Sequence, residues 1–191
     1  MVALIGSTLA FATPVTAEGH EDSRLAGADR YETAAALAAD RPCLGAAAVV
    51  NGSNFPDGLA AASTGLPVLL VEQDSIPAAT AEYIEDCAGG YIAVVGGESV
   101  ISSDVFEDLI NLSGGANVER LAGANRYETA LAVADWWDDG APCDVILATG
   151  ENFPDALAAG PLAWEANATI VLTSGSSLRA DVKAYLATME D

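Results

Sequence analysis

The sequence is poor in basic residues. Its 191 residues include 7 Lys and Arg against 28 Asp and Glu, a formal net charge of −21. This shortage of cations excludes a general nucleic-acid binder, which needs a basic surface to displace the counterions of phosphate groups. It also argues against docking to an anionic membrane through a basic face. Charged residues make up only 18% of the chain, so the acidity comes from missing cations rather than from a highly charged surface.

Histidine is almost absent, and this narrows the enzyme classes that the chain could belong to. The one histidine, His20, stands in a polar stretch before the first patterned segment, where a solvated tail is the favoured interpretation. Zinc hydrolase sites need two or three His ligands, and Ser/His or Cys/His pairs need a positioned imidazole. None of the three cysteines has Cys-x-x-Cys spacing. We therefore predict no metal site and no cofactor.

Residues 1–17 contain no charged side chain. An apolar run at 2–12 is too short for a membrane span, and Val-Thr-Ala at 15–17 fits the small-x-small rule for signal peptidase. We interpret residues 1–17 as a signal peptide and 18–23 as a linker; the alternative is the start of a buried strand or helix.

Two motifs occur twice in the same order. RLAGADRYETA at 24–34 returns as RLAGANRYETA at 120–130, and NFPDGLAA at 54–61 returns as NFPDALAA at 152–159. Such self-similarity indicates a modular architecture. We therefore expect a first repeat at 24–119 and a second at 120–191, which is incomplete because nothing in it matches the segment around Gly96 and Gly97.

Each repeat alternates between strand-like and helix-like segments. Short apolar runs rich in β-branched residues predict buried parallel strands at 46–51, 67–71, 91–95, 144–149 and 169–173. Alanine-rich stretches predict helices at 30–39, 56–63, 77–87 and 104–112. The alternation predicts an α/β fold in which a layered, mainly parallel sheet is flanked by helices.

The first motif fits a helix capping box. Asp29 with Glu32, and Asn125 with Glu128, have the spacing in which the first side chain caps the helix and the Glu reaches back. Capping leaves Arg30 and Arg126 unexplained, because the start of a helix disfavours cations. We expect each arginine to face an acidic partner or an acidic ligand.

The second motif lies between a strand and a helix, where open α/β sheets place their ligands. It supplies Asn54 and Asp57 in the first repeat and Asn152 and Asp155 in the second. One interpretation is a recognition loop. The favoured one pairs Asp57 with Arg30, and Asp155 with Arg126, inside each repeat, because a carboxylate at a helix start opposes an anionic ligand.

Two further features admit two interpretations each, and the cysteines suggest a disulfide. Gly96 and Gly97 form a backbone turn or allow a close backbone approach. The tryptophans Trp136, Trp137 and Trp164 pack helices on the sheet, the favoured interpretation, or stack on sugars. In an exported protein a disulfide between Cys43 and Cys87 is plausible, because each precedes a neighbouring strand, and Cys143 is then the odd cysteine.

The two paired motifs, with VVGG at 94–97 and Val-Ile-Ser at 100–102, resemble the cell wall binding repeat 2 family over residues 24–191. The resemblance implies Rossmann-like or Toprim-like modules that are secreted and anchor proteins to anionic secondary wall polymers of Gram-positive bacteria. Members usually carry three modules around a pseudo-threefold axis. The family associates a Pro-x-Leu-Leu stretch with polymer binding, which here is Pro67, Val68, Leu69 and Leu70.

We therefore predict a non-catalytic module of the cell surface that binds a wall polysaccharide or a teichoic-acid-like polymer. The candidate polymer-binding residues are Arg30, Pro67, Val68, Leu69, Leu70, Gly96, Gly97 and Arg126. The alternative is the targeting fragment of a peptidoglycan hydrolase, an amidase, whose catalytic domain is absent. A glycosidase using only carboxylates also stays open, although no acid stands out in just one repeat. Self-association, or packing with further repeats, is expected because the second repeat lacks elements that would cover its apolar surface.

Overall fold

The computed structural model describes residues 24–138, 144–152, 154–175 and 177–189. The predicted signal peptide and linker, His20 and Cys143 lie outside this part of the chain. No helix within it is long and apolar enough to cross a membrane.

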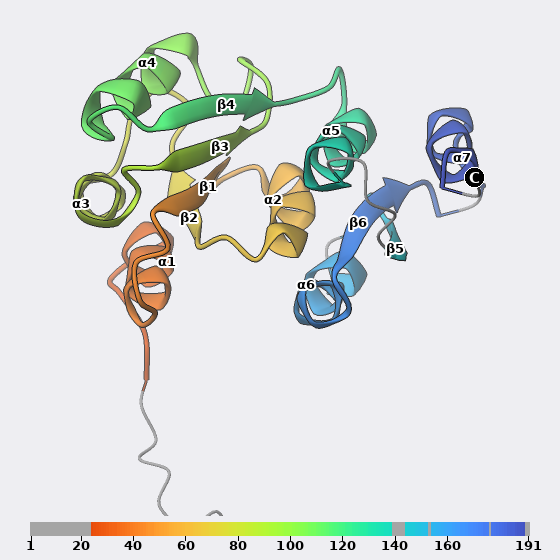
Figure 1. Cartoon of the computed structure of the whole chain (residues 1–191), viewed down its shortest axis with the longest axis horizontal. Coiled ribbons are helices and arrows are strands. Elements are labelled where there is room, and N and C mark those ends of the chain that lie inside the picture. The colour runs from red at the N-terminus through yellow and green to blue at the C-terminus, as the bar shows by residue number, and fades with distance from the viewer. Residues whose placement is uncertain (1–23, 139–143, 153, 176, 190–191) are drawn as a thin grey trace, which may run out of the picture.

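The first repeat is built around a four-stranded parallel sheet with strand order β2-β1-β3-β4 (Figure 1). The three predicted strands are present as β1 (Ala46–Asn51), β2 (Val68–Val71) and β3 (Tyr91–Val95). The fourth, β4 (Asn117–Leu121), was not expected from the sequence. It alternates exposed and half-buried residues and carries a Glu-Arg pair, so its composition lacks the apolar signal of a buried strand. It spans the expected boundary between the repeats.

Helices cover both faces of this sheet, as expected for an α/β fold. They are α1 (Arg30–Ala39), α2 (Phe55–Ala61), α3 (Ala78–Cys87) and α4 (Ser103–Leu112). A short 3-10 helix, η1 (Ala62–Thr64), replaces the predicted last turn of α2. Gly65 ends it with a φ of 65°, in the left-handed region that glycine adopts without steric cost.

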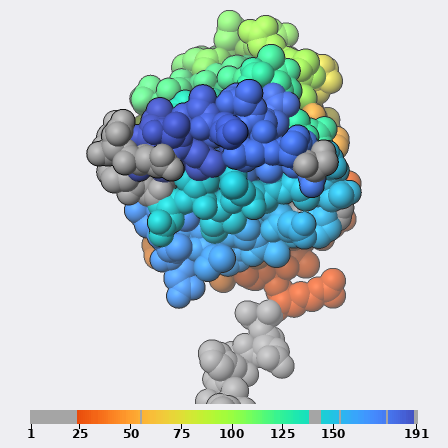
Figure 2. Space-filling model, turned by 90° about the vertical axis from the view of Figure 1, so that its right-hand side faces the viewer, coloured from red at the N-terminus to blue at the C-terminus, as the bar shows by residue number. Residues whose placement is uncertain are grey.

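The second repeat contains a parallel pair of strands, β5 (Asp144–Thr149) and β6 (Ala168–Thr173). Its helices are α5 (Arg126–Asp138), α6 (Pro154–Ala166) and α7 (Ala180–Ala187). Among the described residues nothing in this repeat matches β3 and α4, so its sheet stays two-stranded. Figure 2 shows the outer face of the molecule, where this repeat, in blue, lies across the first.

The two repeats share a hydrophobic core. One cluster of buried side chains belongs to the first repeat and includes Val49, Leu69 and Ile84. A larger one joins Val50 of β1 with Ile170 of β6. Helix α2 packs against α5, so the shared core passes between these two helices (Figure 1).

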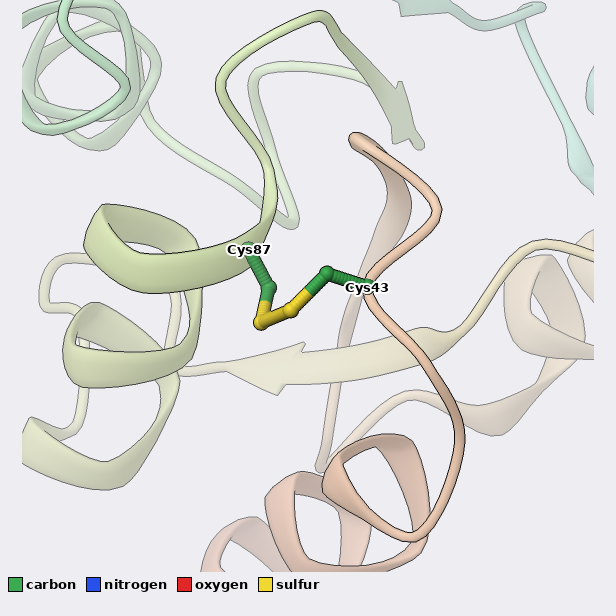
Figure 3. The surroundings of a disulfide bond; sticks show 2 residues. All are labelled: Cys43 and Cys87. Atoms are coloured by element: carbon green, nitrogen blue, oxygen red, sulfur yellow. A yellow bond between two sulfur atoms is a disulfide. The ribbon is translucent and has the colours of Figure 1, made fainter.

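A disulfide joins Cys43, in the connection between α1 and β1, to Cys87 at the end of α3 (Figure 3). The Cα atoms are 5.0 Å apart, and the bridge links positions 44 residues apart in the sequence. It is the pairing that the sequence made plausible, and it ties the end of α3 to the connection that precedes β1.

Candidate functional site

The first shared motif builds the start of a helix in each repeat. Asp29 Oδ1 accepts hydrogen bonds from two backbone N–H groups of the first turn, at 2.8 and 2.9 Å, and Glu32 Oε2 accepts one from Ala28 N at 2.7 Å. Asn125 and Glu128 repeat this arrangement at α5. Both capping boxes therefore satisfy N–H groups that a helix start leaves without a partner.

The arginine of each motif binds a backbone carbonyl. Arg30 donates from Nη1 to Gly52 O at 2.6 Å, and Arg126 donates to Gly150 O at 2.7 Å. The tyrosine that follows each arginine packs on the same glycine, so closely that an added Cβ would lie 2.7 Å from a ring carbon. Arginine, tyrosine and glycine thus hold the helix start against the end of the first strand in both repeats.

The ion pairs expected inside each repeat do not form. Neither Arg30 with Asp57 nor Arg126 with Asp155 makes a salt bridge, and the described residues contain one such bridge, Arg179 with Asp181 at 2.8 Å. The reason is that each guanidinium is already directed at a carbonyl of its own repeat. The prediction of internal pairing was wrong because it assigned a carboxylate to a group that takes a neutral acceptor.

Asp57 instead lies in the contact between α2 and α5, which we call the repeat joint. It is 7% exposed and faces Thr129 and Arg126 of the second repeat. Burial raises the pKa of the Asp57 carboxyl, while the hydrogen bond with Thr129 and the charge of Arg126 oppose this rise. Its counterpart Asp155 is exposed. The same motif residue is therefore internal in one repeat and on the surface in the other.

A small polar cavity of about 190 Å³, which we call the joint cavity, lies beside Asp57. Residues from both repeats line it, among them Asn54, Asp57, Gly97, Ser99, Arg126 and Thr129. It therefore brings together two candidate residues, Gly97 and Arg126, that are distant in sequence.

The loop beside this cavity is held by Arg120 of β4. Arg120 Nη1 donates to Gly96 O at 2.8 Å and to Ile101 O at 3.0 Å, and its guanidinium lies 4.8 Å from the centre of the Phe106 ring. Burial lowers the pKa of Arg120, although the nearby Glu98 opposes this. Gly96 has a φ of 128°, and an added Cβ would lie 3.0 Å from Asp57 Oδ2, so glycine is required there.

A larger, mostly apolar groove of about 950 Å³, which we call the α1–α6 groove, runs between these two helices and along β2. Pro67, Val68 and Leu70 line it, whereas Leu69 is fully buried in the core of the first repeat. The predicted polymer-binding stretch is thus split, because successive strand residues point to opposite faces. Arg30 is exposed outside both cavities.

The structure also gives roles to residues whose function the sequence left open. Trp164 is 55% exposed and lines the α1–α6 groove, so it does not serve as a buried helix-to-sheet contact. Trp136 stacks on Tyr91 across the repeats, with ring centroids 5.4 Å apart. Sequence reasoning did not identify Arg120 as the residue that holds the loop, because only its three-dimensional position reveals the carbonyls around it. No group of three His, Cys, Asp or Glu side chains that could hold a metal occurs in the described part of the chain.

Comparison with known proteins identifies the relatives of this chain. Residues 24–106 and 120–189 match Cell wall binding domain 2 (CWB2). The chain is 31% identical over 185 residues to the N-acetylmuramoyl-L-alanine amidase LytC of Bacillus subtilis (strain 168), covering 93% of this chain and 36% of the relative. It is 35% identical over 161 residues to the Amidase enhancer of the same organism, covering 81% of this chain and 22% of that protein.

Two solved structures from Clostridium difficile share the fold. Cwp8 superposes with a TM-score of 0.75 at 30% identity, covering 85% of this chain and 29% of that one. Cwp6 superposes with a TM-score of 0.76 at 24% identity, covering 93% and 30%. The chain thus spans about a third or less of each of these relatives. The family match covers both repeats and includes the motifs that build the repeat joint, so this chain belongs to the CWB2 family of cell wall binding domains.

Proposed function

We propose that this chain anchors a secreted protein to an anionic secondary polymer of the Gram-positive cell wall, and that it does so without catalysis. The observation that carries the proposal is the family match over both repeats. An intact, buried repeat joint supports it, because the two modules then present one continuous binding surface. The residues proposed to meet the polymer are the exposed or cavity-lining members of the predicted set: Arg30, Pro67, Val68, Leu70, Gly97 and Arg126.

Charge sets how such binding depends on solution conditions. A chain with 28 acidic and 7 basic residues gains little from counterion release, so added salt should weaken wall binding only slightly. Divalent cations should strengthen it by bridging carboxylates to the polymer. The test is sedimentation with purified cell walls, in parallel with the same walls stripped of their anionic polymers. Binding only to the unstripped walls is expected, and equal binding to both would contradict the proposal.

The likeness to LytC favours a second candidate, namely that the chain is the targeting part of an amidase. The binding proposal and this candidate agree that these residues do not hydrolyse peptidoglycan. Incubating the chain with insoluble peptidoglycan should therefore release no soluble fragments, with an active amidase as the positive control. Release above background would show that the chain itself is an enzyme.

The uncovered faces of α1 and α6 favour packing with a further repeat. Leu59 of α2 is 4% exposed within the repeat joint, whereas its counterpart Leu157 of α6 is 56% exposed. Val133 of α5 is fully buried, whereas its counterpart Leu37 of α1 is 52% exposed. Each of the two buried leucine and valine positions in the joint therefore has an uncovered counterpart in the other repeat. Both counterparts, Leu37 and Leu157, line the α1–α6 groove. A further repeat seated there would cover both by the contacts already present between α2 and α5.

A further inference from the structure

The joint cavity has the position of a ligand site. From β1 the chain passes through α2 to β2 on one side, and then crosses through α3 to β3 on the other side of β1. The order of the strands therefore reverses between β1 and β3. Open α/β sheets bind their ligands outside the carboxyl ends of the strands at such a reversal. Asn54 follows β1 and Gly97 follows β3, so the cavity lies at this point.

The second repeat completes the cavity. Asp57 and Thr129 are buried, whereas Asn54 and Ser99 are exposed. Neither the Asn54 amide nor the Ser99 hydroxyl makes a hydrogen bond to another described side chain or backbone group. Arg126 uses one of its five N–H donors on Gly150 O. Polar groups are therefore available from both repeats, and the cavity exists only because the joint brings them together.

The size and charge of the cavity limit what it can hold. A volume of about 190 Å³ is below the 300–1,000 Å³ that is typical for drug-sized ligands. This volume equals that of roughly six water molecules at ~30 Å³ each, so the cavity can hold a molecule with one ring but not a dinucleotide. Asp57 opposes a phosphate group, and with Arg126 it leaves the lining balanced in charge. A lining that donates and accepts hydrogen bonds without net charge matches the hydroxyl groups of a sugar.

We propose that the joint cavity binds one sugar residue of a wall glycan through its hydroxyl groups, an inference that rests on the proposed wall-binding function. Asn54 and Ser99 contact the sugar at the rim, and Arg126 donates from the second repeat. Binding at this site requires both repeats, so the repeat joint is part of the recognition surface.

The first experiment is an NMR titration of the ¹⁵N-labelled whole chain with N-acetylglucosamine, glucose and inorganic phosphate as separate probes. At least one sugar should shift the amide signals of Gly97, Ser99 and Arg126, and phosphate should leave them in place. Shifts produced by phosphate, or sugar-induced shifts confined to the α1–α6 groove, would overturn the proposal. So would the absence of any sugar-induced shift at these amides.

Variants then test the site without disturbing the fold. Asn54→Ala and Ser99→Ala should each weaken sugar binding by about two- to tenfold, the effect of one hydrogen bond. Gly97→Phe should abolish it, because an added Cβ meets no atom within 4 Å and the ring would fill the cavity. Asn152→Ala is the matched control, since it is the exposed counterpart of Asn54 in the second repeat.

Sedimentation with cell walls separates this proposal from the proposed function. If the unmodified chain does not bind walls, the proposed function fails. If the unmodified chain binds walls and Gly97→Phe binds them equally well, the wall-binding function stands and the joint cavity is not its sugar site. Circular dichroism and the unfolding midpoint confirm that each variant is folded before it is compared.

Discussion

At the scale of single residues, repetition of a motif does not mean repetition of an environment. Asp57 and Asp155 occupy the same place in the same motif, yet one is buried against another repeat and the other is exposed. The difference lies in what packs on each helix, since α2 is covered by α5 and α6 faces a groove. A property that depends on burial, such as a carboxyl pKa, therefore differs between the two positions.

Asp57→Asn should change how stability depends on pH. Burial raises the pKa of Asp57 above its ordinary value of 3.8, so in the window just above that value the folded state binds more protons than the unfolded state. Stability from this group is thus greatest below that window and falls as pH rises through it. The amide cannot titrate, so this fall should be missing from the variant. Urea unfolding of the unmodified chain and of Asp57→Asn, at several pH values above 3.8, measures this fall in stability. Superimposable pH profiles for the two proteins would contradict the burial argument.

Gly150→Ala should destabilise the second repeat. The new Cβ would lie 2.7 Å from a Tyr127 ring carbon, so the tyrosine ring must shift, whereas Arg126 Cδ at 3.4 Å would be in ordinary contact. Such overpacking costs about 1–3 kcal/mol of the free energy of unfolding. Gly89→Ala is the control, because its nearest neighbour is 3.8 Å away. Equal unfolding midpoints for the two variants would argue against the close packing of tyrosine on glycine.

At the scale of elements, equivalent helices differ in what they bury. Helix α5 places Val133 in the shared core, whereas α1 places Leu37 in the α1–α6 groove. The sequence pattern alone suggests similar roles, because both helices follow the same motif. Only the neighbouring element decides which face becomes core.

Val133→Asp and Leu37→Asp make a matched pair that tests this difference. A charge at the fully buried Val133 lacks a partner and should cost about 3–5 kcal/mol of the free energy of unfolding. The same change at the half-exposed Leu37 should stay within about 0.5 kcal/mol. Thermal or urea unfolding measures both. A large loss at Leu37 in a dilute, monomeric sample would show that this face is already covered.

The disulfide ties α3 to the connection before β1, and its removal should destabilise the first repeat. A bridge across 44 residues restricts the unfolded chain by an amount worth about 4 kcal/mol. The double variant Cys43→Ser with Cys87→Ser should therefore lose about 4 kcal/mol of the free energy of unfolding and unfold at a lower urea concentration. Reduction of the unmodified chain is the control and should reproduce the loss. An unchanged midpoint in both samples would mean that the bridge contributes no stability.

At the scale of the whole molecule, the repeat joint is a head-to-tail contact, and each repeat keeps the other half of such a contact uncovered. Heterologous contacts of this kind either close into rings or continue as open assemblies. Because the uncovered halves on α1 and α6 line one groove, the open surface is concentrated in one place. The molecule should therefore associate through this groove rather than through its acidic outer surface.

Light scattering should show concentration-dependent self-association of the chain. Sedimentation with cell walls should show weak binding by the monomer. Introducing Leu37→Asp together with Leu157→Asp should abolish the association, because both residues are more than half exposed in the groove. Linking modules can raise binding by about 10²–10⁴, so a chain with an added repeat should bind walls more tightly. A strictly monomeric chain with tight, cation-independent binding would contradict this view.

The sequence by itself determined the local structure and the family. Motifs such as Asp29-x-x-Glu32 act over a single helical turn, and the apolar runs of β1 and β3 need only burial, so both could be predicted from neighbouring residues. The tertiary structure alone decided where each polar group points. Arg30 donates to a backbone carbonyl and makes no salt bridge with Asp57, and Asp57 contacts residues of the other repeat. Strand β4 pairs with β3 in the first sheet despite its polar composition. These outcomes depend on which elements pack against each other. The hydrophobic pattern of a sequence indicates whether a segment is buried, but it does not indicate which element covers that segment.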